Sequence, residues 1–94
     1  MATYILLGTL TEEGAERIRE HPEQLEEVRR NLETLGVKVM AQYAVLGPYD
    51  IVHIIEAPDN RTVVHVSTQL TLKGSLRITT LPALPIDDFI SGLR

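Results

Sequence analysis

The stretch GPYDIVHIIEAPDN, residues 47–60, holds a turn, a strand and a second turn, and it decides how the chain is organised. Gly47-Pro48 breaks the apolar pattern that precedes it, and Pro58-Asp59-Asn60 is a turn that also supplies a helix N-cap. Between the turns, residues 51–57 are apolar on both faces, which is typical of a strand that is covered on both sides. The stretch therefore predicts a central strand bounded by two turns.

Upstream of this strand, the pattern predicts a strand, a broken helix and another strand. Residues 4–10 are a compact apolar run that ends at Thr11, whose hydroxyl can cap a helix. Apolar residues then recur at gaps of three, four or seven as far as Leu35, as on one face of a helix. His21-Pro22 interrupts this face, because proline lacks an amide donor and restricts the residue before it. We expect one broken helix or two helices end to end, followed by a strand at residues 37–46.

Downstream of the central strand, the pattern predicts a second helix, a fourth strand and a short terminal helix. Residues 61–72 carry an apolar stripe at helical spacing, and residues 75–83 alternate in the manner of a strand. Two prolines near the end of that strand place it at an edge of the sheet. The tail from residue 86 is expected to form a short helix that docks through Phe89 and Ile90.

The resulting order is β-α-β-β-α-β, which predicts an α+β fold of the ferredoxin-like type in a single domain, residues 1–94. Such a fold is an antiparallel sheet with its helices on one face. The strands at residues 4–10 and 51–57 are apolar on both sides, although the helices cover only one. Another copy of the chain, packed sheet against sheet in a two-fold dimer, is the expected second cover. The sequence therefore predicts a homo-oligomer.

Composition excludes several function classes for this chain of 94 residues. Nine Lys and Arg against thirteen Asp and Glu give a net charge of −4, which disfavours nucleic-acid binding. There is no cysteine, and no apolar run approaches the roughly 20 residues of a membrane span. No two histidines stand at metal-ligand spacing. We expect a cytoplasmic protein without metal, cofactor, nucleic-acid or membrane partner.

Three residues near the central strand are candidates for chemistry. Tyr49 and Asp50 either build the turn, with Asp50 bonded to loop amides, or orient a ligand at the mouth of a cleft. His53 lies between isoleucines, so it is either a satisfied core or interface histidine or a general base in a pocket. For each of these residues the structural interpretation is the stronger one.

Arg77 and Thr79 share one face of the fourth strand and are candidates for ligand binding. With Lys38 and Gln42, which partial alternation places on one face of the second strand, Arg77 is a candidate to bind a small anionic ligand on the exposed sheet face or at an interface. The stronger interpretation is an edge-strand charge that discourages unwanted sheet pairing.

The segments YILLGTLTEEG, GPYDIVHIIEAPDN and SLRITTLPAL, with the His-Pro pair in the first helix, resemble the GYD domain family. The resemblance covers nearly the whole chain in the right order. It implies a small α+β fold related to the dimeric α/β-barrel group, and it implies no particular reaction. Relatives in the wider group include small monooxygenases and regulatory modules, so the fold alone does not choose between them.

Together these observations favour a cytoplasmic homo-oligomeric binding or regulatory module. Its ligand or partner contacts are expected near the turn at residues 47–50 and the strand at residues 75–83, through Tyr49, Asp50, Arg77 and Thr79. The alternative is a small cofactor-independent barrel-type enzyme that uses His53 with Tyr49 or Asp50 for proton transfer. A structural assembly subunit without a ligand is a third hypothesis.

Overall fold

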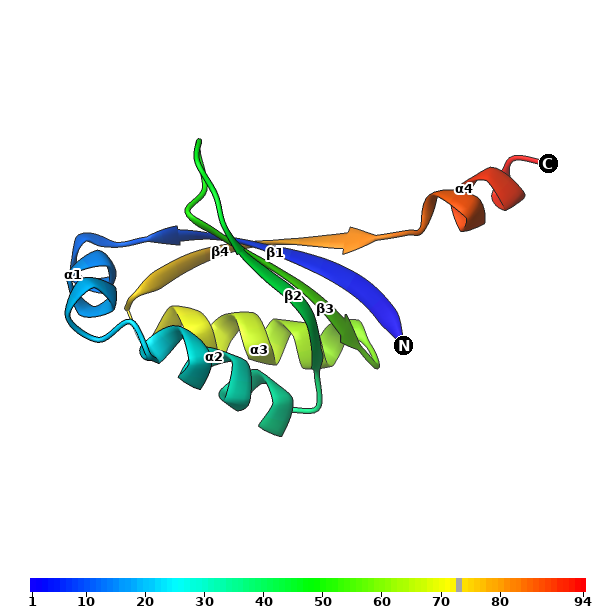
Figure 1. Ribbon diagram of the computed structural model, residues 1–94. Coiled ribbons are helices and arrows are strands. Elements are labelled where there is room, and N and C mark those ends of the chain that lie inside the picture. The colour runs from blue at the N-terminus through cyan, green and yellow to red at the C-terminus, as the bar shows by residue number, and fades with distance from the viewer. Residues whose placement is uncertain (73) are drawn as a thin grey trace.

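The computed structural model describes residues 1–72 and 74–94, and it has one antiparallel sheet with its larger helices on one side (Figure 1). The strands lie in the order β2-β3-β1-β4. The predicted α+β fold with its β-α-β-β-α-β order is therefore confirmed. The elements are β1 (Ala2–Leu10), α1 (Glu12–Glu20), α2 (Gln24–Thr34), β2 (Lys38–Ala44), β3 (Ile51–Ala57), α3 (Asn60–Leu72), β4 (Leu76–Ala83) and α4 (Ile86–Gly92).

The helix boundaries follow from local chemistry. The Thr11 hydroxyl accepts a hydrogen bond from the Gly14 amide at 3.0 Å, so the predicted cap of α1 is confirmed. Pro22 falls in the break between α1 and α2, which makes them two separate helices. Gly36, with φ of 90°, provides the left-handed residue at which the chain leaves α2.

The hydrophobic core lies between the sheet and the helices α2 and α3, which cover the same face (Figure 1). Alternate residues of each strand point into it, including Leu6 of β1 and Ile55 of β3, both fully buried. The Tyr4 hydroxyl donates to the side-chain carbonyl of Asn60, which ties β1 to the start of α3. The core cluster comprises Tyr4, Leu6, Leu32, Val37, Val39, Ile55, Ala57, Val63, Val66 and Leu70.

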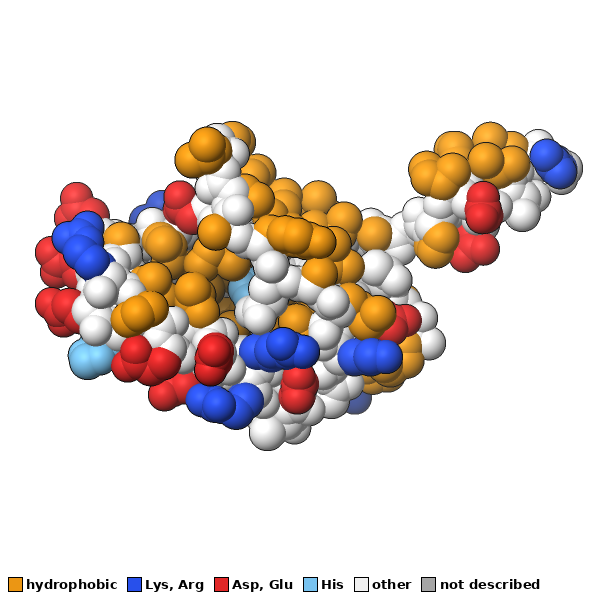
Figure 2. All heavy atoms as spheres, viewed as in Figure 1, with side chains coloured by type: hydrophobic (Ala, Val, Ile, Leu, Met, Phe, Trp, Pro, Cys, Tyr) orange, Lys and Arg blue, Asp and Glu red, His pale blue; other side chains and the backbone are white. Residues whose placement is uncertain are grey.

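The other side of the sheet, here the open face, is not covered by any helix of the described residues (Figure 1). The strand register places the remaining alternate residues there, and those at its centre are apolar and half-buried. Figure 2 shows hydrophobic side chains gathered on this upper side of the molecule. The open face consists of Thr3, Ile5, Leu7, Thr9, Lys38, Ala41, Tyr43, Val52, Ile54, Glu56, Arg77, Thr79, Leu81 and Ala83.

Strand β2 contains an irregularity that overturns one prediction. Its register with β3 shifts between Val39 and Ala41, so one extra residue stands on β2. Gln42 is consequently opposite His53 and faces the helices, whereas Lys38 is on the open face. The expectation that Lys38 and Gln42 share one face is wrong, because an extra residue reverses the alternation of everything that follows it.

The C-terminal arm, residues 84–94, stands away from the rest of the molecule (Figure 1). The longest dimension is 51 Å and the radius of gyration is 14.1 Å, compared with about 12 Å expected for a compact chain of this length. The predicted terminal helix is present as α4, but Phe89 is 53% exposed and Ile90 is also exposed. The tail therefore forms its helix without docking these two side chains on its own chain.

Candidate functional site

Asp50 fastens the connection between β2 and β3 to the end of β1. Its backbone amide donates to the Gly8 carbonyl at 2.9 Å, and its carboxylate oxygen Oδ2 accepts from the Leu10 amide, also at 2.9 Å. Two hydrogen bonds from one residue thus hold the hairpin beside the last residues of β1 before α1. This geometry is the one expected of a residue that positions the loop.

The hairpin tip, residues 45–49, projects beyond that anchor on the side of the open face (Figure 1). The Val45 amide donates to the Asp50 carbonyl at 2.9 Å and closes the loop at its base. Gly47 has φ of 116°, a conformation that favours glycine and turns the chain back. Leu46 is 101% exposed, and Tyr49 is half-buried next to Asp50. The hairpin tip therefore carries an apolar side chain that no described residue covers.

Arg77 and Thr79 lie on the open face of the edge strand β4, where they are opposite Thr9 and Leu7 of β1. Both side chains are exposed, and Arg77 has no ion pair among the described residues. The Asp50 carboxylate bonds to Leu10, and Arg77 is opposite Thr9, so both lie beside the last residues of β1. Tyr49, Asp50 and Arg77 are therefore at the same end of the sheet.

The predicted anion site around Arg77 does not form with the other two residues that were expected in it. Lys38 is opposite Glu56, which in turn is opposite Thr3, so Lys38 lies at the far end of the sheet. Gln42 faces the helices. The predicted grouping of Arg77 with Lys38 and Gln42 is therefore wrong. Arg77 remains as an exposed cation at its end of the open face, without the other two residues.

His53 is in the core, with 0% of its surface exposed and both ring nitrogens without a hydrogen-bond partner. Desolvation lowers the pKa of the imidazole below its ordinary value, because the buried site disfavours the charged form. Its neighbours across the strands are Leu6 and Gln42. A general base needs hydrogen-bond reach to its substrate, and this placement offers none. The proton-transfer hypothesis therefore finds no support in the geometry around His53.

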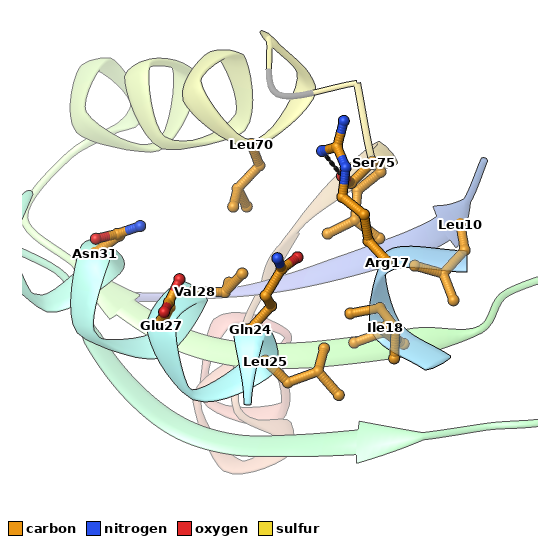
Figure 3. Close-up of a pocket in the computed structure, with 12 residues that line it drawn as sticks. Leu10, Arg17, Ile18, Gln24, Leu25, Glu27, Val28, Asn31, Leu70 and Ser75 are labelled. Carbon is orange, nitrogen blue, oxygen red and sulfur yellow. Dashed lines mark hydrogen bonds between the residues drawn. The ribbon is translucent and has the colours of Figure 1, made fainter. Parts of the chain in front are cut away.

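A cavity of about 290 Å³ lies between the helices and the covered face of the sheet (Figure 3). Ile18 of α1, Val28 of α2 and Leu70 of α3 point toward the same space. Arg17 stands at its edge, where the guanidinium donates to the Ser75 hydroxyl at 2.8 Å and pairs with Glu13 at 2.6 Å. The volume is near the lower limit for small-molecule sites.

None of the residues predicted for a site lines this cavity, and the sequence reasoning missed it. No local pattern marks the cavity, because its lining comes from α1, α2 and α3 together with residues of β1, β3 and β4. The start of β4 closes one end: the Ser75 carbonyl accepts from the Thr11 amide at 3.1 Å. Gly14 packs so closely there that an added Cβ would stand 2.1 Å from the Ser75 carbonyl oxygen.

The described residues offer neither a metal site nor a membrane-spanning helix. Across residues 1–72 and 74–94, no three His, Asp or Glu side chains are grouped in a way that could hold a metal ion. Over the same ranges, no helix combines the length and the apolar character needed to cross a membrane.

Comparison with known proteins identifies the relatives of this chain. The family model of the GYD domain matches residues 4–93. A protein of Thermus thermophilus named "Glutamine synthetase and cystathionine beta-lyase binding protein" is 47% identical over 95 residues and is aligned over the full length of both chains. The crystal structure of TTHA0845, also from Thermus thermophilus, matches with a TM-score of 0.61 at 28% identity, covering 90% of this chain and 95% of the other.

Proposed function

The chain belongs to the GYD domain family, as the resemblance predicted, and we propose that it is a single-domain binding module that self-associates and docks on other proteins. The name of the relative at 47% identity, which describes a protein that binds two enzymes, supports the docking part of this proposal. The alignment of both chains over their full length means that the relative has no additional domain to which that binding could be attributed.

The observation that carries the proposal is the unpartnered apolar surface of the open face. Ile5, Leu7, Val52 and Ile54 form the centre of a sheet that has helices on its other side only. Contiguous exposed apolar surface of this kind is uncommon on monomers and marks interaction sites. A second copy of the chain, bound through the same surface in a two-fold arrangement, covers both open faces at once. The apolar centre of the open face is thus assigned to self-association.

The docking contacts with another protein are assigned to the end of the sheet that carries Tyr49, Asp50, Arg77 and Thr79. Arg77 is an exposed cation without an ion pair among the described residues, and Tyr49 is half-buried at the same end of the sheet. Arg and Tyr are among the residue types most enriched where partners bind tightly. A carboxylate, on a partner side chain or on a small anionic ligand, is the group that matches the arginine. By analogy with the relative, glutamine synthetase and cystathionine β-lyase are the first partners to test.

The test measures binding of the purified chain to each of these two enzymes by titration calorimetry. We expect the Arg77→Glu variant to raise the Kd by about tenfold or more, because the reversed charge repels the carboxylate that it formerly paired with. Arg30→Glu is the matched control, since Arg30 is an exposed arginine of α2 on the other side of the molecule. Equal Kd values for the two variants would contradict the assignment, and binding to neither enzyme would contradict the docking proposal.

A further inference from the structure

The C-terminal arm has the chemistry of a surface that is covered in the assembled protein. Ile86, Phe89, Ile90 and Leu93 recur at the spacing of one helix face, and all four are exposed. An isolated helix of seven residues is not stable in water without packing partners. In Figure 2, the hydrophobic side of the arm faces the same way as the hydrophobic side of the sheet. The arm therefore needs a cover that approaches from the side of the open face.

The arm and the hairpin tip leave the sheet at opposite ends. The arm follows Ala83, which is opposite Thr3 at the start of β1. The hairpin tip precedes Asp50, which bonds to Gly8 and Leu10 at the end of β1. The intervening strand spans about 20 Å at the usual rise of roughly 3.3 Å per residue. A chain that buried its own arm under its own hairpin tip would have to fold back over the whole open face.

We propose that the arm of each copy packs on the hairpin-tip end of a second copy, in a two-fold dimer whose open faces meet with their ends exchanged. This inference rests on the self-association proposed above and adds the segments that complete the interface. In this arrangement, the apolar stripe of α4 covers Leu46, which is fully exposed at the tip of its own chain. The arm leaves Arg77 and Thr79 free for the proposed docking, because they belong to β4, at the opposite edge of the sheet from the hairpin of β2 and β3. Each copy gives an arm and receives one, as two-fold symmetry requires.

The open face by itself is smaller than a standard interface, which favours a contribution from the arm. Four strands about 4.8 Å apart and seven to nine residues long give the open face a planar footprint of roughly 500 Å². A stable interface of standard size buries roughly 800 Å² on each partner. The arm and the hairpin tip add large exposed apolar side chains at both ends of that footprint, which moves the contact toward the standard size.

Site-directed cross-linking tests the proposal directly, because the chain has no cysteine of its own. Leu46→Cys and Phe89→Cys are made as separate variants, one of them with a mass tag, and are mixed and treated with a short bismaleimide in the absence of any enzyme. We expect the link between positions 46 and 89 to form at least tenfold faster than links between two positions 46 or two positions 89. His65→Cys mixed with Phe89→Cys is the matched control, since His65 is an exposed residue of α3 on the helix side.

Each outcome decides one point. A dominant link between two positions 89, or no link in a sample that sedimentation shows to be dimeric, overturns the placement of the arm and leaves the open-face dimer intact. A single-chain particle overturns the dimer and the arm together. A second variant, Phe89→Asp, is expected to raise the dimer Kd by at least tenfold with the circular dichroism of the fold unchanged. If this variant leaves the dimer unchanged and abolishes enzyme binding, the arm serves the enzyme and the proposal is overturned.

Discussion

Alternate residues of the same strands make the two faces of the sheet, yet helices cover one face and leave the other open. On the covered face Leu6 is fully buried against α2 and α3, whereas the next residue, Leu7, is half-buried on the open face. Helices within the chain complete the first face. The second face has an apolar centre too, and its proposed cover is a second copy of the chain. Under this proposal, neighbouring residues encode the stability of the fold and the association between copies.

The largest effect is expected from truncating these two neighbours in turn. Leu6→Ala removes a fully buried side chain and should lower the free energy of unfolding by about 2–5 kcal/mol, because it leaves a cavity in the core. Leu7→Ala should lower the apparent stability by less, and its effect should depend on protein concentration, because in the proposed dimer Leu7 contacts the second copy. Urea titrations at two protein concentrations measure both. The comparison would be contradicted if the loss of stability depended on protein concentration for Leu6→Ala and did not depend on it for Leu7→Ala.

The covered side can also be perturbed where α1 meets β4. Gly14→Ala places a methyl group 2.1 Å from the Ser75 carbonyl oxygen, so the backbone must move, at a cost of about 1–3 kcal/mol in the free energy of unfolding. Gly92→Ala in the arm is the matched control, since an added Cβ there meets no atom within 4 Å. Thermal unfolding should show a lower Tm for Gly14→Ala only. Equal Tm values for the two variants would contradict the close contact of α1 with β4.

The anchor of the hairpin tip provides a smaller test. Asp50→Ala removes the acceptor of the Leu10 amide and should lower the free energy of unfolding by about 1 kcal/mol. Asp50→Asn keeps a side-chain carbonyl at the same place and should remain within roughly half a kcal/mol of the parent. If asparagine costs as much as alanine in a urea titration, the carboxylate has a role beyond this hydrogen bond.

The smallest expected effect concerns pH. Burial lowers the pKa of His53, so the folded chain resists protonation while the unfolded chain takes up a proton below about pH 6.5. Stability should therefore fall as the pH is lowered through 6.5, by less than about 1 kcal/mol between pH 7 and pH 6. His53→Leu should remove this dependence, and the exposed His65→Leu should keep it. Urea midpoints across this range give the slopes, and identical slopes for both variants would show that another group is responsible.

Periodicity and turn residues were sufficient to predict most of the fold. The Thr11 cap, the break at Pro22 and the strand at Ile51–Ala57 are local features, and their structural consequences are local too. The face of the sheet on which Gln42 lies could not be predicted. No residue type marks the irregularity beside Met40, and one extra residue reverses the alternation of the residues after it.

The candidate site was less accessible to sequence reasoning, because its members come from separate strands. The sequence marked Tyr49 and Asp50 as turn residues, but the bond from Leu10 to Asp50 depends on how β1 and the hairpin meet in space. Lys38 and Arg77 looked like one anion site, and the strand register places them at opposite ends of the sheet. The cavity beside Arg17 depends on the gap between α1 and α2, which no single stretch of residues records.

The central claim is that a second copy of this chain covers the open face, and sedimentation equilibrium at micromolar concentration tests it most directly. The account predicts a particle with the mass of two 10.5 kDa chains, which dissociates when Leu7 or Ile5 is replaced by aspartate while the circular dichroism stays that of the folded chain. A parent protein that sediments as a single 10.5 kDa chain at this concentration would contradict the account.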